Sequence, residues 1–349
     1  MPQYQILLLS YLYTLPIILF IIYRKRQRVG FFFYLACSLY LLFLCFRPET
    51  IGTDTISYKE SFECSTYLIT DNYEFSWIVI CILFDNYFHL GIESVFLIYA
   101  LITILPIIYV CKAGSLYPYM SLLFFFVTFG LMPFNIMRHC AAMSLCLLTI
   151  HFLSKGKNIS ALCSCALAII FHNSAIVLVI FVLIIYMLKR TSFSNRTLLL
   201  LLWITLLVGF VSFNLMSNVI GMLPSEKYSA YSDYALSRGV NVKNMFIMNI
   251  INLCWGSIFL NFQGDRPKSL YYWTYYLSFL IGNFLGYQIG ANRVLFFISI
   301  SSVIFIPNLI GNKEENEYRK RSRIVSFYCL FMILMFFINV LTNKDDINP

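Results

Sequence analysis

Apolar stretches long enough to cross a lipid bilayer recur along almost the whole chain, and they limit the possible folds more than any other feature. A helix needs about 20 apolar residues to cross the hydrocarbon. Of the 349 residues, 60% are hydrophobic and only 12% are charged, so the chain lacks the polar side chains that a water-exposed surface requires. We therefore predict an all-α, polytopic integral membrane protein with a single transmembrane domain, residues 1–349. We expect about 12 spans (roughly 10–13), at 4–23, 29–46, 92–111, 116–133, 135–154, 159–172, 174–189, 197–216, 245–262, 270–288, 291–311 and 324–342.

The stretch 159–189 is predicted to hold two helices. As one helix it would be about 45 Å long, which is more than the hydrocarbon needs. We place the break at Phe171-His172-Asn173-Ser174.

Basic residues separate clearly when these spans are used to assign sides. Of the 25 Lys and Arg residues, 17 fall in one set of alternate loops. By the positive-inside rule that set is cytoplasmic, so both termini face outward. The outer side then carries two longer loops, 47–91 and 217–244. Within the first, the apolar stretch Phe75–Leu90 is typical of a helix that lies along the membrane interface.

Three arginines lie at helix ends on this outer side, where few basic residues are expected: Arg47, Arg138 and Arg293. An arginine inside or beside a membrane span is costly to bury, so each one is informative. One explanation is that their side chains reach lipid headgroups. The other is that they bind a substrate.

Two residues on the same side are candidates for a general base. His172 falls at the outer end of its predicted span, level with Arg138, and a neutral imidazole there can accept a proton near neutral pH. Asp54 follows Arg47 closely enough to be held beside it. A histidine that is simply satisfied within the core is the alternative for His172. The other outer carboxylates, Glu74 among them, are expected to be solvated loop residues.

A tyrosine-rich segment, 227–234, lies in the second outer loop. Phenol rings bind sugars by stacking and hydrogen bonding, which makes Tyr228 and Tyr231 candidate substrate contacts. The same rings also suit an aromatic belt at the membrane interface.

Three segments resemble the EpsG family of bacterial exopolysaccharide membrane proteins: FRPETIGTDTISYKESFE at 46–63, the segment 134–178 that opens FNIMRHCAAM, and ANRVLFFISISSVIFIPNLI at 291–310. The shared pattern is a G-x-D-x-x-x-Y motif containing Asp54 and Tyr58, then N-x-x-R at Asn135 and Arg138. A small-residue helix ending in F-H-x-S and a late helix opened by an arginine complete it.

This resemblance implies a function, because the family is grouped with Wzy-type repeat-unit polymerases. Such enzymes join oligosaccharide units carried on undecaprenyl pyrophosphate, at the outer leaflet of the bacterial inner membrane. Arginine suits that donor, since its guanidinium makes bidentate, permanently charged contacts with phosphate. An envelope transporter or flippase, and an O-antigen ligase that uses the same donor, are the alternatives.

The resemblance also implies site residues and partners. Arg138 and Arg293, with Arg47 as a third, would hold the pyrophosphate, and Asp54 or His172 would accept the acceptor's proton. Further substrate contacts are expected from Asn135, Tyr58, Tyr228 and Tyr231. We expect no cofactor and no metal, since no group of outer carboxylates stands together in a motif. The expected partners are the lipid-linked oligosaccharide, membrane lipid, a chain-length regulator and a flippase, with no nucleic acid.

Overall fold

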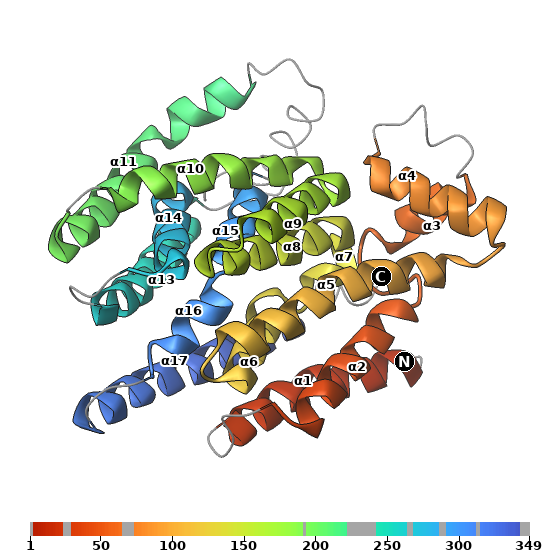
Figure 1. Ribbon diagram of the computed structural model, residues 1–349, viewed down its shortest axis with the longest axis horizontal. Coiled ribbons are helices and arrows are strands. Elements are labelled where there is room, and N and C mark those ends of the chain that lie inside the picture. Colours follow the sequence, from red (N-terminus) through yellow and green to blue (C-terminus); the bar gives the residue numbers. More distant parts are fainter. Residues whose placement is uncertain are drawn as a thin grey trace. The chain divides into compact units, whose positions relative to one another are not determined.

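The computed structural model describes residues 3–23, 29–64, 73–190, 193–221, 242–263, 268–285, 291–311 and 315–342. All regular secondary structure in these ranges is helical (Figure 1). This confirms the predicted all-α fold class.

The chain forms two compact units, residues 1–176 with 302–349, and residues 177–301. We describe each unit by itself, and the single transmembrane domain stays a prediction. The first unit contains α1 (Gln3–Tyr23), α2 (Phe31–Cys45), α3 (Thr55–Glu63), α4 (Phe75–Ile82) with the π-helical turn η2 (Leu83–Tyr87), α5 (Ile92–Gly114), α6 (Pro118–Phe129), α7 (Met132–Asn135), α8 (Met137–Ser154), α9 (Asn158–Phe171), η3 (Asn173–Ile176), α16 (Ser302–Asn308) and α17 (Glu315–Thr342). The second contains α10 (Val177–Lys189), α11 (Asn195–Gly221), α13 (Val242–Gln263), α14 (Leu270–Leu285), η4 (Ala291–Leu295) and α15 (Phe296–Ser299).

Three helices of the described part are long and apolar enough to cross a membrane: Ile92–Gly114, Met137–Ser154 and Glu317–Ile338. Eight further apolar helical segments are shorter, at 10–17 residues. Apolar helices of this number and length are typical of a membrane protein. The number of crossings stays a prediction.

The break predicted within 159–189 is confirmed. Helix α9 ends at Phe171, and His172 takes an extended backbone (φ −159°, ψ 114°) before the short 3-10 helix η3. A helix is also present where the interfacial helix is predicted, as α4 with its π-helical extension η2, and its place at the membrane interface stays a prediction.

Three features differ from the sequence-based expectation. The stretch 291–311 is broken into η4, α15 and α16; at the second break the Ser301 hydroxyl donates to the Ile298 carbonyl (2.7 Å), which competes with the helical pattern. Helix α17 begins at Glu315, inside the stretch 312–323 that lies between two predicted spans, and Arg321 and Glu317 form an i, i+4 ion pair there (3.8 Å). Helix α3 was not predicted.

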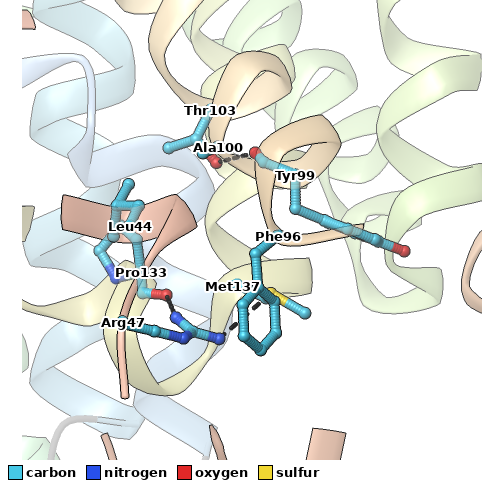
Figure 2. A pocket seen from close by; sticks show the side chains of 8 residues that line it. All are labelled: Leu44, Arg47, Phe96, Tyr99, Ala100, Thr103, Pro133 and Met137. Carbon is cyan, nitrogen blue, oxygen red and sulfur yellow. Dashed lines mark hydrogen bonds between the residues drawn. The ribbon is translucent and has the colours of Figure 1, made fainter. Parts of the chain in front are cut away.

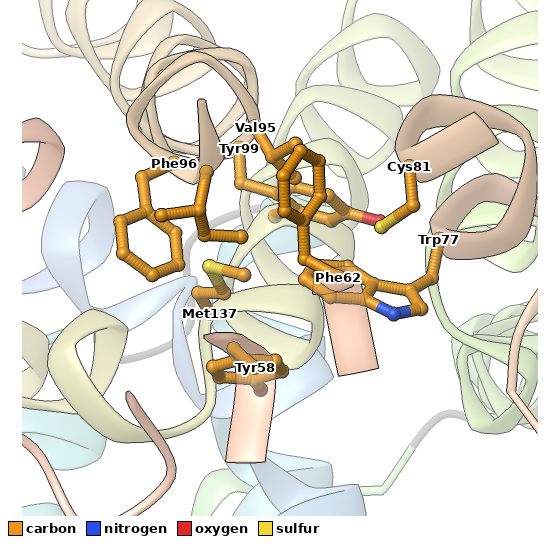
Figure 3. Packing of buried hydrophobic residues seen from close by; sticks show 10 residues of the cluster. Tyr58, Phe62, Trp77, Cys81, Val95, Phe96, Tyr99 and Met137 are labelled. Atoms are coloured by element: carbon orange, nitrogen blue, oxygen red, sulfur yellow. The ribbon is translucent and has the colours of Figure 1, made fainter. Parts of the chain in front are cut away.

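Helices α3 and α4 pack on α5 and α8 through one buried cluster (Figure 3). Its members include Tyr58 of α3, Trp77 of α4, Phe96 and Tyr99 of α5, and Met137 of α8. The Tyr58 and Trp77 rings lie 5.2 Å apart between centroids, and the Trp77 and Tyr99 rings 5.8 Å. Aromatic packing of this kind fixes α3 and α4 against α5 and α8.

Within the second unit, polar contacts connect α11 to α14. Asn283 Nδ2 donates to the Leu202 carbonyl (2.8 Å), and the Tyr272 hydroxyl donates to Asn195 Oδ1 (3.1 Å). Hydrogen bonds between helices are common in membrane proteins, where few other partners exist for a buried polar group.

Candidate functional site

Three ionisable side chains from distant parts of the first unit meet at one place. Glu74 precedes α4, Arg138 is the second residue of α8, and His172 follows α9. One carboxylate oxygen of Glu74, Oε2, forms an ion pair with Arg138 Nη1, and the other, Oε1, lies 2.7 Å from His172 Nδ1. We call these three residues the Glu74 cluster.

The hairpin of α8 and α9 brings two members of the cluster together. A short turn at 155–157 joins the helices, so the start of α8 and the end of α9 lie at the same end of the pair. Gly156 takes a positive φ of 71° in that turn, and the Thr149 and Ser164 hydroxyls are hydrogen-bonded across the helices (2.8 Å). The prediction that His172 is level with Arg138 is therefore confirmed.

The carboxylate of Glu74 is buried, with 9% of the residue exposed. Burial alone raises the pKa of Glu74, but the hydrogen bond from His172 and the charge of Arg138 outweigh it, and the pKa is lowered overall. Glu74 is thus ionised at neutral pH and can only accept hydrogen bonds. The proton of a neutral His172 then belongs on Nδ1, which leaves the lone pair on Nε2.

Aromatic rings surround the guanidinium of Arg138. Its Cζ lies 5.2 Å from the ring centroid of Tyr73, 5.6 Å from Tyr58 and 5.7 Å from Trp77. These cation–π contacts stabilise a charge that has lost much of its water. The Arg138 side chain is still 21% exposed, so solvent reaches part of it.

A second histidine lies beside the cluster. His139 is buried, and its ring makes an edge-on contact with His172, with centroids 5.0 Å apart. This contact limits the orientations that the His172 ring can take.

Arg47 is buried and makes its contacts within the protein (Figure 2). Its Nη1 donates to the Pro133 carbonyl (2.8 Å) and its Nη2 to Met137 Sδ (3.4 Å), while Cζ lies 4.1 Å from the Phe96 ring centroid. These residues border a cavity of about 10 Å³, roughly the space of one water molecule. Arg47 therefore holds the chain segment that leads into α8.

The Gly52-Thr53-Asp54 turn rests on the same segment. Thr53 N donates to Asn135 Oδ1 (2.9 Å), and Gly52 has a positive φ of 86°. Asn135 thus fastens the outer loop in place. Asp54 is half-buried just before α3 and accepts a weak hydrogen bond from the Thr53 hydroxyl (3.4 Å).

The comparison with known proteins now identifies the chain's relatives. The model of the EpsG family matches residues 30–349. The chain belongs to the EpsG family. No curated protein and no solved structure matches it.

Of the residues that carried the EpsG resemblance, the structure brings Arg138, His172 and Tyr58 together. The burial of Tyr58 raises the pKa of its hydroxyl, although the charge of Arg138 opposes this. Arg293 belongs to the second unit, where it is exposed in η4. Tyr228 and Tyr231 lie outside the described residues.

The expectation that Glu74 is a solvated loop residue is wrong, because this carboxylate is buried between two cationic or protonatable partners. Glu74 stands directly before the apolar stretch 75–90, at a helix N-terminus, where a negative charge is stabilised. Glu93 has a similar position in the first turn of α5, so this signal alone does not single out Glu74 in this EpsG protein.

Within the described part of the chain, no three His, Cys, Asp or Glu side chains form a group that could hold a metal ion. The expectation of metal-independent chemistry stays a prediction.

Proposed function

We propose that this EpsG protein is a membrane glycosyltransferase that polymerises oligosaccharide repeat units carried on undecaprenyl pyrophosphate. The observation that supports this most is the pairing of His172 Nδ1 with a buried, ionised Glu74. A base whose second nitrogen is held by a carboxylate is a recurrent arrangement for taking a proton from a hydroxyl group.

In the proposed reaction, His172 Nε2 accepts the proton of a sugar hydroxyl on the incoming unit. The hydroxyl oxygen attacks the anomeric carbon of the growing glycan and forms the new glycosidic bond. The bond from that carbon to the carrier's pyrophosphate breaks, and the pyrophosphate leaves as an anion. Glu74 orients the imidazole and stabilises its charged form. Between the two bases that the sequence left open, this geometry favours His172 over Asp54.

Arginines would stabilise the departing pyrophosphate. Arg138 is the first candidate, because its side chain is partly exposed and it pairs with the same carboxylate as His172. Arg293 is the second. The internal contacts of Arg47 favour a positioning role, in which it holds Pro133 and Met137 ahead of Arg138.

We place this activity in the bacterial inner membrane, with the Glu74 cluster on its outer face. The distribution of basic residues supports this orientation, since the cluster belongs to the loops with few Lys and Arg residues. The carrier lipid would then enter from the bilayer, and a flippase and a chain-length regulator would act alongside.

Complementation of a polymerase-null strain of the source organism tests this proposal. Wild type should restore long glycan chains, whereas Arg138→Ala and His172→Ala at matched membrane levels should leave single repeat units on the cell surface. A null strain with no surface glycan at all would favour a ligase or a flippase. Full-length chains in both variants would refute the assigned site.

A further inference from the structure

A groove of about 420 Å³ opens between residues 47–59 and the start of α5. We propose that it binds an uncharged, hydroxyl-rich sugar of the incoming repeat unit, which deepens the proposed function and rests on it. The groove is lined by Arg47, Pro48, Glu49, Thr50, Thr55, Lys59, Ile92, Glu93 and Phe96. Its volume is that of a small-molecule site.

The polar groups of the groove suit sugar hydroxyls. Lys59 of α3 forms an ion pair with Glu49, and Glu93, in the first turn of α5, adds to the negative field at Lys59. Carboxylates accept hydrogen bonds from hydroxyl groups, while the lysine ammonium donates to sugar oxygens. All three side chains are exposed enough to exchange water for a ligand.

The charges also indicate what the groove does not bind. Two carboxylates, Glu49 and Glu93, face a ligand there, and a pyrophosphate would be repelled by both. The two acids balance the charges of Lys59 and Arg47. An uncharged ligand therefore fits this groove better than an anionic one does.

Arg47 and Tyr58 connect the groove to the Glu74 cluster. Arg47 borders the groove, and its Cζ lies 5.9 Å from the ring centroid of Tyr58. Arg138 Cζ lies 5.6 Å from the same centroid. A sugar in the groove is thus separated from the cluster by the Arg47 and Tyr58 side chains, and we expect a neighbouring sugar of the same unit to reach His172.

Binding measurements on the full-length protein in nanodiscs test this inference. The probes are the repeat-unit oligosaccharide, released from its carrier by mild acid, and inorganic pyrophosphate. The Glu49→Gln/Glu93→Gln double variant should bind the oligosaccharide about tenfold more weakly, as expected when hydrogen bonds to charged groups are lost. Glu60→Gln, which removes an exposed carboxylate of α3 outside the groove, should bind like wild type.

The single Glu93→Gln variant, expected to weaken binding severalfold, replaces the double variant if the latter misfolds. Unchanged affinity in the groove variants, or pyrophosphate binding that depends on them, would overturn the inference. A third outcome separates the two proposals. If the wild-type protein binds the sugar through the groove but cannot extend lipid-linked units, the proposed function is overturned and the sugar site still stands.

Discussion

Glu74 holds two partners at once, and this makes it the residue on which the site depends most. A buried carboxylate loses its water, and only well-placed hydrogen bonds and charges offset that cost. Arg138 and His172 supply them, one on each oxygen. Removing the charge of Glu74 would leave the Arg138 guanidinium among aromatic rings with no anion beside it.

Glu74→Gln should therefore lower the free energy of unfolding by about 1–3 kcal/mol, the range for a buried group deprived of its charged partner. Thermal unfolding in nanodiscs measures this. Glu60→Gln is the matched control, since Glu60 is exposed and should change stability by less than about 0.5 kcal/mol. Equal losses in the two variants would mean that the Glu74 cluster stabilises nothing.

The same cluster should make stability depend on acid. Because the pKa of Glu74 is lowered in the folded protein, its pairing stabilises the fold above the ordinary glutamate pKa of 4.5. This contribution is lost as the pH falls through the lowered value. The stability difference between wild type and Glu74→Gln should shrink from about pH 5 to about pH 3. A difference that grows with acid over this range would show that the folded-state pKa is raised.

Sequence reasoning found two members of the cluster for a physical reason. Arg138 and His172 are polar residues in apolar surroundings, so each stands out in its own segment. Glu74 lies among other acids in a polar loop, and its partners are 64 and 98 positions away along the chain. Local sequence cannot indicate a pairing over that distance.

At the scale of elements, the apolar stretches predicted the helices well, because hydrophobic length alone specifies a membrane helix. Helix α3 was missed because TISYKESFE is mostly polar, and it is held by Tyr58 and Phe62 packing on the cluster of Figure 3. Tertiary packing, which the sequence does not display, decides such a helix.

The contact between the outer loop and α7 can be tested at Gly52. Its φ of 86° is strained for any other residue, and a Cβ there would overlap the carbonyl of Phe134. Gly52→Ala should cost about 2 kcal/mol or more and reduce glycan length, since the loop carries α3. Gly156→Ala separates the cost of the backbone strain from the cost of the steric overlap. Gly156 also has a positive φ, of 71°, but a Cβ there would meet nothing within 4 Å. It should cost about 1 kcal/mol. If both variants behave alike, the packing of Gly52 on α7 has no role.

At the scale of the whole molecule, the orientation in the membrane can be measured with a native residue. Cys64 is exposed at the end of α3, on the side proposed to face outward. A membrane-impermeant maleimide added to intact spheroplasts should label the wild-type protein, and Cys64→Ser should lose that label. Labelling of Cys64 only after the membrane is opened would place the Glu74 cluster on the cytoplasmic side and contradict the proposed orientation.

The most direct test of the central claim is the extension of lipid-linked repeat units by the purified protein in nanodiscs containing EDTA. Wild type should build chains, because no metal is expected to take part. His172→Ala and Glu74→Gln should slow extension at saturating substrate at least about 100-fold, as the loss of a general base does, while Glu60→Gln keeps the wild-type rate. Extension by Glu74→Gln at the wild-type rate would show that the Glu74 cluster does not carry the reaction.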